Sequence, residues 1–142
     1  MLLGALAALP AAAQNNPARP LPKLEVLPSK TYPFDQLPTT GSDGHKGHTV
    51  MHGTTHGGFS VQVHITELGA GLEPHPPHRH VHEEIIMLKE GTCDVTVEGK
   101  TTRIGPGGVA YNASNELHGL KNVGTTTAVY FVVELRGDEP RA

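Results

Sequence analysis

The sequence contains little of several residue types, and each shortage excludes a class of protein. Among 142 residues there is one cysteine, Cys93, and no tryptophan. A single cysteine excludes an internal disulfide, a CxxC redox pair and a cysteine-rich zinc site, so we expect Cys93 to be a small buried hydrophobe. Basic residues are not in excess, because 11 Lys+Arg oppose 14 Asp+Glu and the net charge is −3. This balance argues against nucleic acid as a partner, since nucleic-acid binders cluster Lys and Arg on one face.

No apolar run in the chain is long enough to cross a membrane as a helix, which takes about 20 residues. The most apolar segment is residues 1–13, MLLGALAALPAAA, which is uncharged and ends in an A-x-A site. This pattern is typical of a secretory signal peptide, with an apolar N-terminal helix of the fold as the alternative. Cleavage would leave residues 14–142 in the periplasm or outside the cell, with no membrane association.

Glycine and proline are abundant, with 17 and 12 residues. So many helix breakers argue against a helical bundle and favour an all-β domain. Six prolines between residues 14 and 41 predict an extended N-terminal arm. Residues 42–58 are rich in His and Gly and predict a polar loop. We expect the histidines of this loop to be solvated; they are His45, His48, His52 and His56.

From residue 59 the apolar residues recur with a period of two, as in β-strands. Short strands separated by Gly and Pro turns predict a sandwich or barrel over residues 59–136, followed by a tail at 137–142. The expected strands cover residues 59–68, 78–89, 92–98, 101–104, 109–112, 119–123 and 126–135.

Ten histidines are an excess, and three residues of one predicted strand suit a metal ion. His78, His80 and Glu84 are separated by even numbers, so their side chains leave the same face. On a flat strand His80 and Glu84 would be about 13 Å apart, so a bend between them is required. His118 is the candidate fourth ligand. His82 lies on the same face and is an alternative to one of these ligands.

Two motifs resemble those of the cupin superfamily. Gly71-x6-His78-x-His80-x3-Glu84-x6-Gly91 is similar to the first cupin motif. Pro106-Gly107-Gly108 followed by His118-x3-Asn122 is similar to the second. The resemblance covers residues 59–135 and implies a double-stranded β-helix (jelly-roll) barrel with a metal near one mouth. It also implies a homodimer, with the proline-rich arm crossing to the partner.

The resemblance implies a set of residues around the ion. One divalent transition metal (Mn, Fe, Ni, Co or Zn) would be held by His78, His80, Glu84 and His118. The substrate pocket would be lined by Val63, Ile86, Leu120, Tyr130 and Val132. Residues expected around the ligands or at the rim are His75, Tyr111 and Asn122. The ligand would be a small organic molecule.

Two functions fit this pattern. The first is a metalloenzyme of dioxygenase, isomerase or lyase type. The second is a non-catalytic module that uses the same cavity to bind a small molecule or sense a metal. A base other than the metal ligands would favour the enzyme, and the sequence offers only Tyr130, Tyr111 and His75 for that role. No catalytic residue is therefore assigned.

Overall fold

The computed structural model describes residues 24–136, and this part of the chain is almost entirely β. After a short 3-10 turn, η1 (Phe34–Gln36), it forms nine strands. The strands are β1 (Thr39–Ser42), β2 (His45–Thr54), β3 (Ser60–Leu68), β4 (Glu83–Glu90), β5 (Cys93–Val97), β6 (Lys100–Ile104), β7 (Val109–Asn112), β8 (His118–Asn122) and β9 (Ala128–Arg136). The all-β prediction is confirmed. The expected signal peptide and tail lie outside the described residues.

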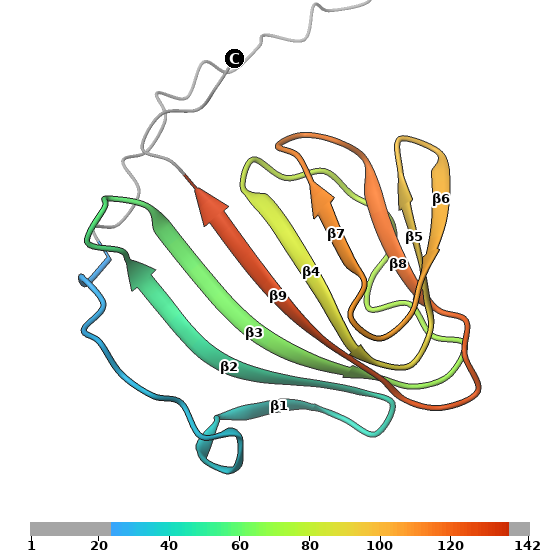
Figure 1. The fold of residues 1–142 in the computed structure, drawn as a ribbon, viewed down its shortest axis with the longest axis horizontal. Coiled ribbons are helices and arrows are strands. Elements are labelled where there is room, and N and C mark those ends of the chain that lie inside the picture. Colours follow the sequence, from blue (N-terminus) through green and yellow to red (C-terminus); the bar gives the residue numbers. More distant parts are fainter. Residues whose placement is uncertain (1–23, 137–142) are drawn as a thin grey trace, which may run out of the picture.

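The strands form two antiparallel sheets. The larger sheet has the order β1-β2-β3-β9-β4-β7, and the smaller has the order β6-β5-β8. Figure 1 shows the larger sheet with its strands side by side from β1 to β7, and the smaller sheet to the right of β7. Within residues 24–136, no helix has the length and apolar content to cross a membrane.

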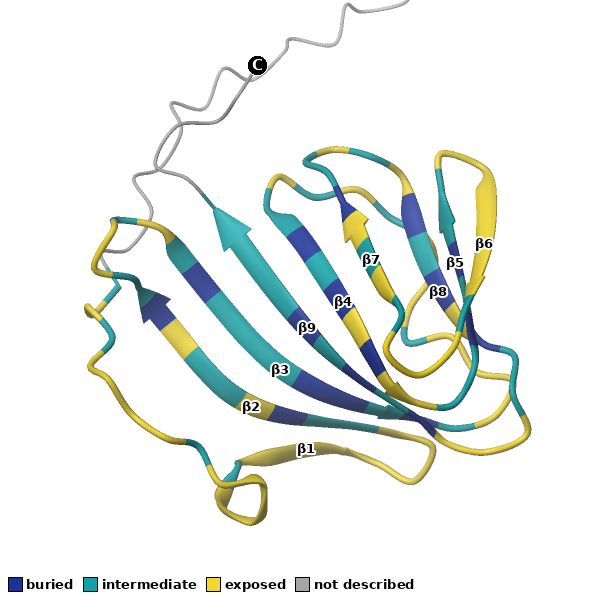
Figure 2. Cartoon of the chain, in the orientation of Figure 1, coloured by how far each residue is buried: buried dark blue, intermediate teal, exposed yellow. Residues whose placement is uncertain are grey.

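The core combines inward-facing residues of both sheets. In β4 and β9, buried residues alternate with less buried ones, as a half-covered sheet requires. Figure 2 shows these buried positions as dark bands along the strands. Cys93 is fully buried in this core, as expected. The buried cluster consists of Leu68, Ile86, Leu88, Cys93, Val95, Leu120, Ala128, Tyr130 and Val132.

Strand β3 alternates as predicted, but it turns the opposite face inward. Leu68 belongs to the core and His64 lines the central cavity, whereas Val63 does not line it. The expectation that Val63 faces the cavity is therefore wrong. Alternation shows which residues share a face but not which face is internal. Here both faces are covered, because Val61 and Ile65 on the other face are only 7% and 6% exposed.

The expected loop at residues 42–58 is also wrong, because most of it forms β2. β2 pairs with β3 over nearly its whole length, and β1 pairs with β2. Ser42 and His45 are opposite each other, so Asp43-Gly44 is a two-residue hairpin turn, with Gly44 at φ 93°. Asp-Gly is a strong signal for such a turn. Gly53 is required where β2 passes Leu27, because a Cβ there would lie 2.7 Å from that side chain.

His48 is one of the four histidines expected to be solvated, but it is only 7% exposed. Its Nε2 lies 2.6 Å from Glu67 Oε1, and its Nδ1 lies 3.0 Å from Thr39 Oγ1. The ring of Phe34 packs against it, with centroids 4.7 Å apart. His48 therefore joins β1, β2 and β3, while His45, His52 and His56 are exposed.

The described part of the proline-rich arm packs against its own protein chain, at the end of β2. Leu27 N donates to Thr54 O, and Thr54 N donates to Glu25 O, which places the arm against the end of β2. Apart from η1 and a single bridge between Val26 and Thr54, residues 24–38 contain no regular structure. Residues 14–23 of the predicted arm lie outside the described part of the chain.

Candidate metal centre

The segment that carries His78 and His80 is not the regular strand that the sequence predicts. Strand β4 begins at Glu83, and before it only an isolated bridge joins His78 to His118. The resulting bend brings His80 Nε2 to 3.9 Å from Glu84 Oε2. The two residues would be about 13 Å apart on a flat strand, so the bend required by the metal hypothesis is present.

All four predicted ligands converge. Ligand atoms of His78, His80 and His118 lie within 4.8 Å of one another. Glu84 completes the group, because its Oε1 lies 3.7 Å from His118 Nε2. Glu84 comes from the larger sheet and His118 from the smaller one, so the group forms where the two sheets meet.

Hydrogen bonds determine which ring nitrogens face this group. His80 Nδ1 lies 2.8 Å from His82 O, and His118 Nδ1 lies 2.8 Å from Glu116 O. A carbonyl oxygen only accepts, so each Nδ1 carries a proton, and in the neutral ring Nε2 then has the free lone pair. Backbone carbonyls commonly orient metal-ligating histidines in this way.

Three ring nitrogens of the group are buried without a hydrogen-bond partner among the described residues: His78 Nδ1, His80 Nε2 and His118 Nε2. An unsatisfied buried polar group costs about 1–3 kcal/mol, so three together need an explanation. Burial, followed by the neighbouring histidines, also lowers the pKa of His78, which favours its neutral form. Neutral imidazoles beside a carboxylate fit a divalent transition metal.

Asn112 is a site residue that the sequence analysis missed. It is fully buried at the end of β7, and its Nδ2 donates to Glu84 Oε1 at 2.8 Å. The two residues are directly opposite each other in the β4–β7 register. Asn112 therefore holds the carboxylate in place. Its Oδ1 has no partner among the described residues.

His82 is close enough to His80 and Glu84 to be an alternative ligand. Ligand atoms of His80, His82 and Glu84 also lie within 4.8 Å of one another. The His82 ring stacks on His80 with centroids 3.5 Å apart, and its Nε2 lies 3.5 Å from Glu134 Oε2. Burial is the main cause that lowers the pKa of His82 to about 4, so its ring is neutral at physiological pH.

A cavity of about 250 Å³ adjoins the four converging residues. Four of the five predicted pocket residues line it, namely Ile86, Leu120, Tyr130 and Val132. Thr66 and Tyr130 share a hydrogen bond, but burial has the larger effect and raises the pKa of Tyr130 well above its usual value. The phenol is therefore protonated. The cavity is also lined by His45, His64, Thr66 and Glu134, which the sequence analysis did not assign to it.

The three residues expected around the ligands lie in different places. His75 lines the cavity, and its ring contacts that of His78 edge to face at 4.2 Å. Tyr111 is 56% exposed on β7. Asn122 is fully buried, but its side-chain amide binds backbone groups of Leu68, Thr126 and Gly124. It braces a turn and contacts none of the four candidate ligands.

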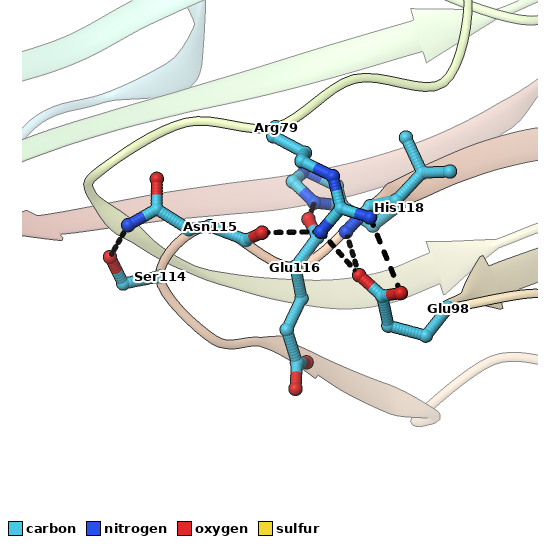
Figure 3. A network of polar contacts seen from close by, with 7 residues as sticks. Arg79, Glu98, Ser114, Asn115, Glu116 and His118 are labelled. Atoms are coloured by element: carbon cyan, nitrogen blue, oxygen red, sulfur yellow. Dashed lines mark hydrogen bonds and ion pairs between the residues drawn. The ribbon is translucent and has the colours of Figure 1, made fainter.

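Arg79, between the two ligand histidines, connects their loop to the segment before His118 (Figure 3). Its guanidinium donates to Glu98 Oε1 at 2.5 Å and to Asn115 O at 2.6 Å. The Glu98 carboxylate in turn accepts from Leu117 N at 2.6 Å. The hydrogen bond from Arg79, followed by that from Leu117 N, lowers the pKa of Glu98. It fixes the spacing between the two histidine-bearing segments from outside.

Similarity to known proteins agrees with this geometry. A family model described as a cupin domain matches residues 64–134. None of the curated proteins matches the chain significantly. A solved RmlC-like cupin from Shewanella frigidimarina is 19% identical, with a TM-score of 0.62 over 80% of this chain and 93% of that one.

Two further solved structures with the same fold have names that describe enzymes. A sugar phosphate isomerase from Silicibacter pomeroyi is 16% identical, with a TM-score of 0.61 over 75% of this chain and 76% of that one. A predicted oxalate decarboxylase from Thermotoga maritima is 18% identical, with a TM-score of 0.62 over 75% of this chain and 98% of that one. The family match extends from β3 to β9 and includes all four converging side chains, so the chain belongs to the cupin family.

Proposed function

We propose that this protein binds one divalent transition metal, Mn, Fe, Ni, Co or Zn, through His78, His80, Glu84 and His118. The observation that carries the proposal is a cluster of three histidines with buried, unpartnered ring nitrogens, two of which lie 3.9 Å and 3.7 Å from the Glu84 carboxylate. A bound ion would polarise a carbonyl or hydroxyl oxygen or, if it is iron, activate dioxygen. Asn112 orients the carboxylate, and the His82 and Glu116 carbonyls orient two of the rings.

The site would serve a small-molecule metalloenzyme of dioxygenase, isomerase or lyase type. The cavity beside the candidate ligands supports this proposal because it is small and partly apolar. It is also lined by Glu134, His64 and His82, ionisable groups outside the four-ligand set. These groups are candidate proton acceptors, in addition to Tyr130, Tyr111 and His75, which were the only candidates that the sequence offered.

We further propose that the protein is secreted or periplasmic and forms a homodimer. The first proposal is supported by the signal-peptide pattern of residues 1–13. The second is supported by exposed apolar residues on the outer face of β4 and β7, where Met87 and Val109 are cross-strand neighbours and are 38% and 60% exposed. A Val109→Lys variant that sediments as a monomer beside a dimeric wild type would support this interface, and a monomeric wild type would contradict it.

Elemental analysis tests the metal proposal. Wild type reconstituted with each of the five metals should retain one ion per chain after gel filtration. A His78→Ala/His118→Ala variant should retain none, while His56→Ala, which changes an exposed turn histidine, should behave as wild type. A folded wild type that holds no stoichiometric metal would end the proposal. If metal binds, oxygen uptake with phenolic compounds would support an enzyme, whereas ligand binding without turnover would indicate a binding module.

A further inference from the structure

A row of polar residues crosses the inner face of the larger sheet beside the metal centre. The strand register places Glu134 opposite Glu84 on one side and opposite Gln62 on the other. Asn112 continues the row beyond Glu84, and His52 continues it beyond Gln62. Residues directly opposite each other in antiparallel strands share a face. Glu134 is therefore a second carboxylate on the cavity wall, next to the proposed metal ligand.

Glu134 has few partners within the protein. Its side chain is 22% exposed, and Nε2 of the neutral His82 ring lies 3.5 Å from its Oε2. No described residue donates a hydrogen bond to it. Burial is the main cause that raises the pKa of Glu134.

His64 lies two residues beyond Gln62 on the same face of β3 and also has few partners within the protein. It lines the same cavity, is cross-strand from Val132, and has no hydrogen bond to any described residue. Burial lowers the pKa of His64, which favours its neutral ring. Neither group hydrogen-bonds to a described residue, and both line the cavity, so a carboxylate and an imidazole are available to pair with a molecule that enters it.

The rest of the cavity limits what this ligand can be. Its volume of about 250 Å³ is a little below the roughly 300–1,000 Å³ of typical ligand pockets, so it suits a small molecule such as a single ring. Ile86, Leu120 and Val132 offer apolar contact to the body of such a molecule. The adjacent carboxylates of Glu84 and Glu134 disfavour an anionic group at this end of the cavity.

We propose that Glu134 and His64 form a hydroxyl-binding subsite beside the metal centre. The substrate class is then a neutral single-ring compound with one oxygen for the metal and a second hydroxyl that donates to Glu134. This inference rests on the proposed function, because the first oxygen needs the metal. Glu134 and His64 would set specificity by selecting hydroxyl compounds over dicarboxylates.

The test compares phenol, which has one hydroxyl, with resorcinol and hydroquinone, which have two. Zinc-loaded protein is used because Zn²⁺ has no redox chemistry that would consume the probes. In calorimetric titrations, wild type should bind at least one of the two diols roughly 10- to 100-fold more tightly than phenol, as expected for a hydrogen bond to a charged group. Glu134→Ala should abolish this preference and leave phenol binding unchanged, and Glu134→Gln should reduce the preference.

The control variant is Glu90→Gln, which removes an exposed carboxylate at the end of β4 and should retain the preference. The subsite is refuted if zinc-loaded wild type binds neither diol more tightly than phenol, binds none of the probes, or loses phenol and diol affinity equally in Glu134→Ala. Zinc content is measured on the same samples. A wild type that holds no zinc would refute the metal proposal and the subsite together. A zinc-loaded wild type without the diol preference would refute the subsite alone.

Discussion

Asn112 offers a direct test of how the metal centre is built, because the chain contains a matched control. Asn112 and Asn122 are both fully buried asparagines. Asn112 donates to the Glu84 carboxylate, whereas Asn122 contacts only backbone groups. Replacing each with alanine therefore removes the same side chain from two differently connected positions.

The expected magnitudes follow from these contacts. Asn112→Ala removes a 2.8 Å hydrogen bond to a buried carboxylate, and a bond to a charged group contributes about 1.5–3 kcal/mol. Loss of such a partner of a metal ligand should weaken metal binding about 10- to 100-fold. Asn122→Ala removes three hydrogen bonds, and at about 1 kcal/mol each it should lower the free energy of unfolding by about 3 kcal/mol.

The assay is metal competition against a chromophoric chelator, at a temperature where circular dichroism shows both variants folded. Urea unfolding of the metal-free proteins gives stability separately. Asn112→Ala should lose metal affinity, and Asn122→Ala should lose stability with an affinity close to that of wild type. Equal losses of affinity in the two variants would refute the reasoning, since the effect would then come from general loosening of the fold.

Three further predictions concern the network, the pH response and the turns. Arg79→Ala should weaken metal binding by less than about 10-fold, because Arg79 hydrogen-bonds to Glu98 and Asn115 rather than to a candidate ligand side chain. As the control, Arg103→Ala breaks a remote ion pair and should have no effect in the same competition assay. Burial lowers the pKa of His64, so the unfolded state binds more protons than the folded state as pH falls below about 6.5. The metal-free protein should therefore be less stable at pH 5 than at pH 7. In melting curves at these two pH values, His64→Gln should lose less stability than wild type. Gly91 and Gly99 have φ of 91° and 79°, but a Cβ would be 2.8 Å from a backbone atom only at Gly91. Gly91→Ala should therefore cost about 1–3 kcal/mol more than Gly99→Ala in urea unfolding.

The sequence predicts the strands from β3 to β9 well because their pattern is local. Apolar residues recur every second position, and Gly or Pro marks most turns, so the expected ranges differ from the observed ones by a few residues in six of the seven strands. The exception is the expected strand 78–89, which begins only at Glu83. The need to bring His80 near Glu84 already required irregular backbone there.

β1 and β2 were missed for a different reason. β2 contains histidines, glycines and threonines rather than alternating apolar residues, and only two of its ten positions are buried. Its stability comes from backbone pairing with β3 and from contacts such as that of His48 with Glu67. A strand that pairs on both sides but has no continuous apolar face leaves little trace in hydrophobic periodicity. The Asp43-Gly44 turn was the available local signal.

The partners of the metal centre could not be predicted from the sequence because they depend on non-local pairing. Glu84 meets Asn112 through β4–β7 and Glu134 through β4–β9, strands that are separated along the chain. The family motifs point to the four candidate ligands, but they do not contain this register. Both partners became apparent only when the order of the strands in the larger sheet was known.

The position of the centre also connects metal binding to the stability of the fold. Glu84 belongs to the larger sheet and His118 to the smaller sheet, while His78 and His80 lie in the segment between β3 and β4, which bridges to His118. In the metal-free state the sheets meet at unpartnered nitrogens, which disfavours their approach. An ion that binds only the folded state would remove this penalty and add about 2.7 kcal/mol of stability at 100 times its dissociation constant. The unpartnered nitrogens would therefore weaken the junction of the two sheets without metal and strengthen it with metal, so that loading and folding depend on each other.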